Sequence, residues 1–168
     1  MFDKKQFHKL QLCFILAFHL KYPLRRDLST VSYTKTEGNY IDVNAQTLHL
    51  NKYKTARKHG ELIYRFTREQ WKLFSWLRKQ HRLRGFTDGH LLMNTYWRPL
   101  NPNAMTSYLK KVCQDYLECC KGKKMGCCLL RHIVVSWKHR KQMTITDREK
   151  LAEEMGHTAE QQELYRVK

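Results

Sequence analysis

Long apolar stretches are absent from this sequence. The longest one, residues 10–20, is interrupted by Gln11 and His19 and is shorter than the ~20 apolar residues that a membrane-spanning helix needs. The N-terminus also lacks the positive lead, apolar run and small-residue cleavage site of a secretory signal. We therefore expect an intracellular protein in a reducing compartment, with its six cysteines present as thiols.

Acidic residues are scarce as well. Fifteen Asp and Glu stand against 32 Lys and Arg, and the formal net charge is +17. A folded domain this basic attracts polyanions, because each phosphate that it neutralises releases a counterion. The charge indicates nucleic acid as the first partner to consider. An anionic membrane surface is the second, and the lack of an apolar anchor argues against it.

Linkers, repeats and low-complexity runs are also missing, so we expect residues 1–168 to form one domain. Apolar residues recur at helical spacing in several segments, and Asn or Thr precedes some of them as a candidate cap. The predicted helices cover residues 5–22, 68–83 and 128–141, a segment capped by Asn101 or Asn103, and a segment that begins after Thr146.

A different pattern fills the region between Thr30 and Phe66. Short runs of alternating apolar residues predict three or four strands, the first of them at 31–33, with turns at 37–39 and 58–60. The sequence therefore predicts an α+β fold that is mostly helical, with a small antiparallel sheet near its N-terminal third.

Two pairs of adjacent cysteines are candidate metal ligands. Cys119 precedes Cys120, and Cys127 precedes Cys128. Adjacent thiols lack the two-residue spacing of a zinc knuckle, and both pairs fall in segments that we expect to be helical. We expect ordinary thiols here, and a metal site or a disulfide is the alternative.

Several segments carry residues suited to phosphate chemistry. In residues 22–28, Arg25 and Arg26 follow the first predicted helix and precede an acidic residue. In residues 50–60, Lys54 belongs to a Lys-Thr pair that approaches a turn between two predicted strands. Arginine offers forked donors that match phosphate oxygens, and lysine can protonate a leaving oxygen.

The C-terminal part supplies three further motifs. Residues 128–132 end in Arg131 and His132, and residues 155–157 end in His157. Tyr165 follows eight residues after His157 and 34 residues after Arg131. A tyrosine phenol can act as a nucleophile and form a covalent intermediate.

In this order, the five segments resemble the active-site motifs of the tyrosine recombinase (phage-integrase) family. The likeness is greatest to the divergent recombinases of large DNA viruses, virophages and mobile elements. It implies Arg25 as the first catalytic arginine, with Arg26 as the alternative register, and Lys54 as the catalytic lysine, with Lys52 and Lys58 as lesser candidates. It further implies Arg131 as the second arginine, His157 as a hydrogen-bond donor to the phosphate, and Tyr165 as the nucleophile.

One position departs from the family pattern. Cys128 stands where the family has a histidine that is thought to assist as a base towards the tyrosine. His132 is a nearby candidate for that role, and a structural role on its helix is the alternative.

The resemblance implies an enzyme that cleaves and rejoins double-stranded DNA through a 3′-phosphotyrosine. It implies a homotetramer on DNA, although we expect this chain alone to be monomeric. The N-terminal core-binding domain of the family has no counterpart in residues 1–168, and the cytosol, nucleus or a viral factory is the expected compartment. No carboxylate cluster suggests Mg²⁺, so we expect no metal and no other cofactor. Phosphate contacts are expected from Lys52, Arg57, Lys58 and Lys138.

Two other functions fit parts of the sequence. A type IB topoisomerase uses most of the same residues, and the motif at 155–157 favours the recombinase. A basic DNA- or RNA-binding module in which Tyr165 is inert would explain the composition alone. Such a module would form no covalent adduct with DNA and would tolerate Tyr165→Phe.

Overall fold

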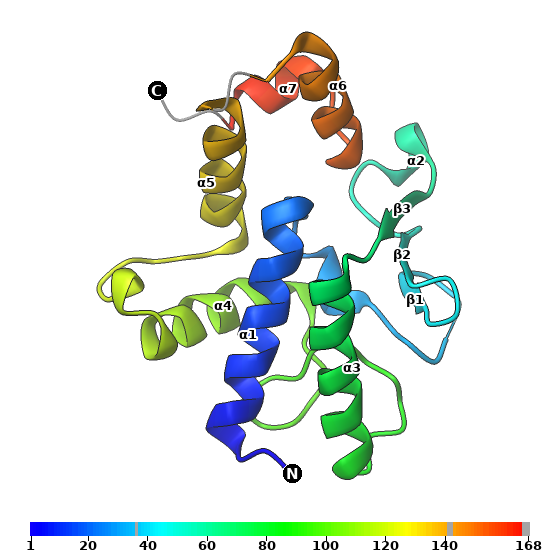
Figure 1. Ribbon diagram of the computed structural model, residues 1–168, viewed down its shortest axis with the longest axis vertical. Helices are drawn as coiled ribbons and strands as arrows, with labels where there is room; N and C mark the ends of the chain where they lie inside the picture. Colours follow the sequence, from blue (N-terminus) through cyan, green and yellow to red (C-terminus); the bar gives the residue numbers. More distant parts are fainter. Residues whose placement is uncertain (36, 141–142, 166–168) are drawn as a thin grey trace.

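A computed structural model describes residues 1–35, 37–140 and 143–165. A small sheet lies at one side of a mostly helical body, as Figure 1 shows. The helices are α1 (Lys4–Lys21), α2 (Ala56–His59), α3 (Arg68–Leu83), α4 (Pro102–Tyr116), α5 (Cys127–Arg140), α6 (Ile145–Glu154) and α7 (Ala159–Glu163). The strands are β1 (Tyr40–Asp42), β2 (Thr47–Leu50) and β3 (Leu62–Arg65), and the 3-10 turns are η1 (Asp27–Thr30) and η2 (Glu118–Cys120). The predicted α+β fold class is confirmed.

Helix α1 forms the centre of the core. It begins with a capping box between Asp3 and Gln6, and it ends at Lys21, with Tyr22 as its C-cap directly before Pro23. Its apolar face, which includes the fully buried Phe14 and Phe18, lies against α3, α4 and α5. Each buried Phe of this kind stabilises the fold by about 1.5–3 kcal/mol. This packing fixes the position of the end of α1, from which residues 22–28, with Arg25 and Arg26, continue.

The sheet is antiparallel with strand order β1-β2-β3. Leu48 of β2 pairs with Ile41 on one side and with Tyr64 on the other. The predicted strand at 31–33 is not formed, because Ser32 makes only isolated bridges to Tyr40 and His90. Three strands are therefore present in the described part of the chain, and the longest connection, between β2 and β3, carries Lys54.

The helix caps confirm one prediction and correct another. Asn101 caps α4 by accepting a hydrogen bond from the backbone N of Ala104, which decides between Asn101 and Asn103. Helix α6 begins two residues earlier than predicted, because Thr144 rather than Thr146 forms the capping box with Asp147. The other predicted helices are found; Lys141, the predicted last residue of α5, lies outside the described residues.

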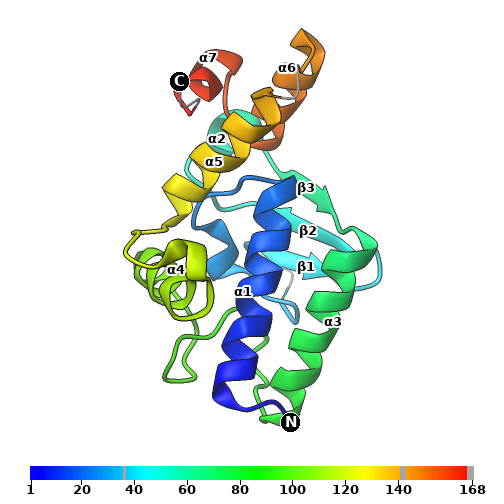
Figure 2. The same cartoon turned by 60° about the vertical axis from the view of Figure 1, so that its left-hand side comes forward.

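Helices α5, α6 and α7 form the end of the molecule that lies away from the start of α1 (Figures 1 and 2). Here Val135, Leu151 and Met155 make a second small core, and Met143 and Tyr165 pack against it. Tyr165 is therefore held by contacts with α5 and α6. Within the described ranges, no helix has the length and apolar character required to cross a bilayer.

Candidate active site

A groove of about 190 Å³ brings together residues from four parts of the chain. Arg25 and Arg26 come from the segment after α1, and Thr106 comes from the first turns of α4. Cys127, Cys128 and Arg131 come from the start of α5, and Tyr165 follows α7. The structure thus places both candidate arginines and the candidate nucleophile in one groove.

Arg131 is the most buried cation of the groove, with 2% of its surface exposed. Its Nη2 lies 3.3 Å from Nε2 of His157, and its Cζ lies over the ring of Tyr165, 4.6 Å from the centroid. Its Nε has no hydrogen-bond partner among the described residues. Burial lowers the pKa of Arg131, but an arginine keeps its charge in proteins. A buried cation with an unused donor is costly unless an anion pairs with it, so this groove is suited to an anion.

His157 is buried beside Arg131. Because a guanidinium can only donate, Nε2 of His157 accepts the hydrogen bond, and the neutral ring carries its proton on Nδ1. Burial, and after it the charges of Arg131 and Arg25, lower the pKa of His157 to about 4. The Nδ1 atom is buried and has no partner in the described part of the chain. His157 is therefore a neutral ring with an unbonded N–H beside Arg131, and it is not itself part of the groove lining.

Tyr165 is half-buried between two histidines. Its ring centroid lies 5.4 Å from that of His157 and 4.8 Å from that of His132. The backbone carbonyl of Tyr165 lies 2.9 Å from Nδ1 of His132 and 3.4 Å from Oγ of Ser136. A carbonyl only accepts, so His132 donates to it. His132 thus holds the backbone that carries Tyr165, which is the structural role that the sequence left open.

One hydrogen bond attaches the β2–β3 connection to the histidine motif, and a second joins strand β3 to the end of α6. Thr55 donates to the carbonyl of Gly156 at 2.8 Å, and Tyr64 donates to the carbonyl of Glu154 at 2.6 Å. Lys54 lies next to Thr55, is exposed and is not part of the groove lining. Its charge still contributes to lowering the pKa of His157. Lys54 is therefore beside the site rather than in it.

Gly156 is required by this attachment. Its φ is +61°, which favours glycine, and a Cβ on it would lie only 2.9 Å from Cε2 of Tyr53. The glycine of the motif at 155–157 therefore allows the close approach of the lysine-bearing connection.

The four expected phosphate contacts differ in their surroundings. Lys52, Arg57 and Lys58 are exposed on the β2–β3 connection. Lys138 is half-buried on α5, where its Nζ donates to the carbonyl of Lys21 at 2.6 Å, and burial lowers its pKa. Lys138 thus connects α5 to the last residue of α1.

Sequence reasoning missed Thr106, which lines the groove and which no local motif marks. Cys127 also lines the groove, and the sequence marked it only as a member of a cysteine pair. Asp27 follows the two arginines; burial raises its pKa, and the charges of Arg25 and Arg131 oppose that rise. The sequence marked Asp27 only as the acidic residue that follows the two arginines.

The cysteines are free thiols in this structure. Cys128 is exposed in the groove, one helical turn before Arg131. The Sγ atoms of Cys119 and Cys120 lie 3.9 Å apart. In the part of the chain that the structure describes, no three His, Cys, Asp or Glu side chains are grouped so that they could hold a metal ion.

The arrangement of these elements is shared with a solved structure. The crystal structure of XerA recombinase superposes on this chain with a TM-score of 0.65, covering 100% of this chain and 58% of the XerA chain. The chain has the fold of a tyrosine recombinase catalytic domain. The two sequences are 12% identical, so the similarity concerns the fold. Neither a family model nor a curated protein sequence matches the chain.

Proposed function

We propose that this chain is the catalytic domain of a tyrosine recombinase, which cleaves and rejoins DNA strands through a 3′-phosphotyrosine at Tyr165. The observation that carries the proposal is the buried, incompletely bonded Arg131, which shares a groove with Arg25 and lies 4.6 Å from the centre of the Tyr165 ring. A phosphodiester in this groove would offer acceptor oxygens to the unused donor of Arg131.

The two arginines would stabilise the transition state. Attack on a phosphodiester builds negative charge on the non-bridging oxygens, and the forked donors of Arg25 and Arg131 match those oxygens. Donors fixed in a partly dry site need little reorganisation as the charge forms, and each is typically worth about 10²–10³ in rate. His157, held neutral by burial, would add its Nδ1–H as a third donor.

Tyr165 would be the nucleophile. Its phenolic oxygen attacks phosphorus, the bond from phosphorus to the 5′ oxygen breaks, and a 3′-phosphotyrosine and a 5′-hydroxyl result. The phosphotyrosine keeps the energy of the diester, so a 5′-hydroxyl from another strand can reverse the step without ATP. Lys54 would protonate the leaving 5′ oxygen, and the phenolic proton would pass to a neighbouring base, for which Cys128 and His132 are the candidates.

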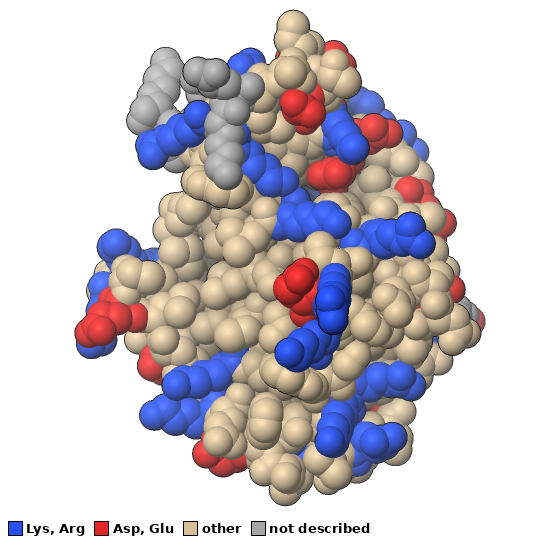
Figure 3. All heavy atoms as spheres, in the orientation of Figure 1, with Lys and Arg blue, Asp and Glu red and all other residues tan. Residues whose placement is uncertain are grey.

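The distribution of charge suits double-stranded DNA. Figure 3 shows Lys and Arg in groups at several places on one face of the molecule, with Asp and Glu among them; over the whole chain the basic residues exceed the acidic ones by 17. Lys52, Arg57 and Lys58 would contact phosphates next to the cleaved bond. We also propose, on the resemblance of the motifs, a homotetramer on DNA, a monomer without it, and an origin in a viral or mobile element acting in a reducing compartment.

The test is the formation of a covalent adduct on nicked DNA duplexes, measured on a denaturing gel. We expect the wild type to form a 3′-linked adduct and Tyr165→Phe to form none. Tyr96, which is 80% exposed and far along the chain, provides the matched control Tyr96→Phe, which should react like the wild type. DNA binding without any adduct would indicate a non-catalytic binder, and relaxation of supercoiled plasmid without strand exchange would indicate a topoisomerase.

A further inference from the structure

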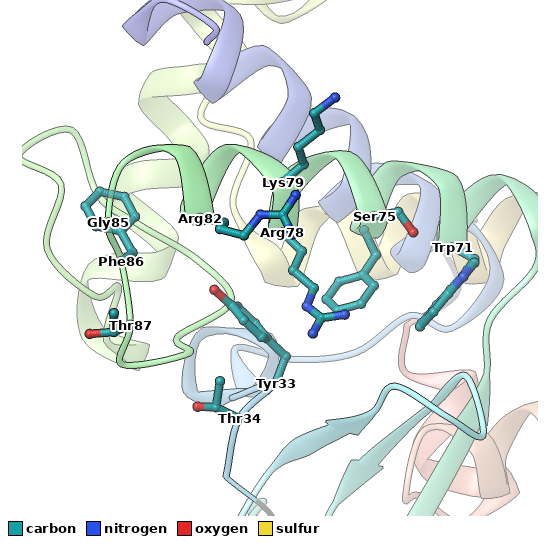
Figure 4. A pocket seen from close by; sticks show the side chains of 11 residues that line it. Tyr33, Thr34, Trp71, Ser75, Arg78, Lys79, Arg82, Gly85, Phe86 and Thr87 are labelled. Atoms are coloured by element: carbon teal, nitrogen blue, oxygen red, sulfur yellow. The ribbon is translucent and has the colours of Figure 1, made fainter.

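A second groove lies along α3, and the proposed chemistry does not use it. Its volume is about 470 Å³, and it shares no residue with the groove of Arg131 and Tyr165. One wall is the face of α3 that carries Trp71, Phe74, Arg78 and Arg82, and the other wall carries Tyr33 and Phe86 (Figure 4). At 1.5 Å per residue, the wall from Trp71 to Arg82 is roughly 16 Å long. We call this feature the α3 groove.

Aromatic rings line the α3 groove at both ends. Trp71, Tyr33 and Phe86 are half-buried, so each packs one part on the core and presents another part to the groove. Trp71 rests on Phe74, with 5.0 Å between the ring centroids. Rings fixed in this way offer stacking surfaces with little loss of side-chain freedom on binding.

The cations of the α3 groove have no ion-pair partners among the described residues. Arg78, Lys79 and Arg82 are all exposed. Arg78 lies over the ring of Tyr33 at 6.0 Å, and Figure 4 shows its guanidinium reaching into the groove, whereas Lys79 points away. Asp88 is the nearby carboxylate, since its charge raises the pKa of Tyr33. Two arginines against one carboxylate leave the groove positive.

We propose that the α3 groove binds single-stranded DNA. Aromatic faces beside a cationic groove are the general means of holding unpaired bases and their backbone. An acidic peptide would satisfy the arginines but would leave the aromatic faces without a matching flat ligand. At ~3.4 Å per stacked nucleotide, the groove length corresponds to about five nucleotides. The inference rests on the proposed function in one respect, which is that strand exchange supplies unpaired DNA next to this domain.

The direct measurement is fluorescence anisotropy with labelled hexathymidylate. We expect Arg78→Ala with Arg82→Ala to weaken binding by at least about tenfold. The slope of log K against log salt should become shallower by about 1.4, because two contacts of about 0.7 each are lost. The matched control removes the same charge from the same helix outside the groove, by Arg68→Ala with Lys72→Ala, and should retain most of the binding. Phe86→Leu, which keeps an apolar side chain and removes the stacking face, should weaken binding about fivefold or more.

Three results would overturn the proposal. They are equal losses in the groove pair and the control pair, competition by hexaglutamate as strong as that by unlabelled hexathymidylate, and loss of hexathymidylate binding in Tyr165→Phe. The adduct assay separates this inference from the proposed function. If the contrast between the groove pair and the control pair appears while no variant forms an adduct, single-strand binding is supported and the recombinase proposal fails. The groove pair itself should still form adducts on nicked duplex.

Discussion

Replacing Gly156 with alanine tests how closely the lysine-bearing connection must approach the histidine motif. A Cβ at this position would lie 2.9 Å from Cε2 of Tyr53 and 3.2 Å from Oγ1 of Thr55. The left-handed backbone costs a residue with a Cβ about 1–2 kcal/mol, and relieving the contacts adds roughly 1–3 kcal/mol. We expect the free energy of unfolding to fall by about 2–5 kcal/mol.

Gly122 provides the matched control. Its φ is +73°, and nothing lies within 4 Å of the position that a Cβ would take. Gly122→Ala therefore carries only the backbone cost of about 1–2 kcal/mol. Urea denaturation followed by circular dichroism measures both losses. Equal losses in the two variants would refute the argument from close approach.

Two further readouts connect this change to the site. Combining Gly156→Ala with Tyr53→Ala removes the closest contact, so the two losses should be less than additive in a double-mutant cycle. Adduct formation should also decrease in Gly156→Ala, because Thr55 and the neighbouring Lys54 must move. Gly122→Ala should leave adduct formation unchanged. A fully active Gly156→Ala variant would mean that the position of the connection has no influence on catalysis.

Three other predictions concern single residues. Lys54→Ala should slow cleavage by about 10²–10⁴-fold. It should not slow cleavage of a substrate whose leaving 5′ oxygen is replaced by sulfur, because a thiolate leaves without a proton. Lys52→Ala is the control, and equal slowing of Lys54→Ala on both substrates would contradict the role of Lys54 as the proton donor. Burial lowers the pKa of His19 to about 4 from 6.5, so the unfolded state binds more protons below pH 6.5. Stability, followed by urea titration, should therefore fall between pH 6.5 and 4, by about 3 kcal/mol for this residue, and an unchanged midpoint over that range would be evidence against it. Thr144→Ala should lower the free energy of unfolding by about 1 kcal/mol in thermal melts, whereas Thr146→Ala should have little effect; the reverse order would contradict the observed cap.

The neutral state of His157 has a physical origin that lies outside its motif. Burial is the largest cause of its lowered pKa, and the charges of Arg131 and Arg25 follow. A third cation next to the two arginines would compete with them for the same anion. A neutral ring instead accepts from Arg131 and keeps one N–H for the ligand. The histidine therefore complements the arginines without adding to their mutual repulsion.

Local sequence determined the helices and most of their ends. The period of apolar residues and the caps act within a few positions, so α1, α3 and α4 could be predicted from their own residues. Where two local signals competed, as between Thr144 and Thr146, the choice depended on which threonine stands three residues before Asp147. The strand predicted at 31–33 failed because a strand requires a partner, and Ser32 finds only isolated bridges.

The site was determined by tertiary structure to a greater degree. The motifs named Arg25, Arg131, His157 and Tyr165, but the groove that holds Arg25, Arg131 and Tyr165, and the contact of His157 with Arg131, depend on the packing of segments that are far apart in the chain. The presence of Thr106 in the groove and the contact of His132 with the Tyr165 carbonyl left no trace in local spacing. Phosphate chemistry restricts which residue types can act as donors, bases or nucleophiles in the site, and these residue types can be recognised in a sequence. Burial, which sets the pKa of His157 and leaves Arg131 without a full set of partners, arises only when distant segments exclude water together.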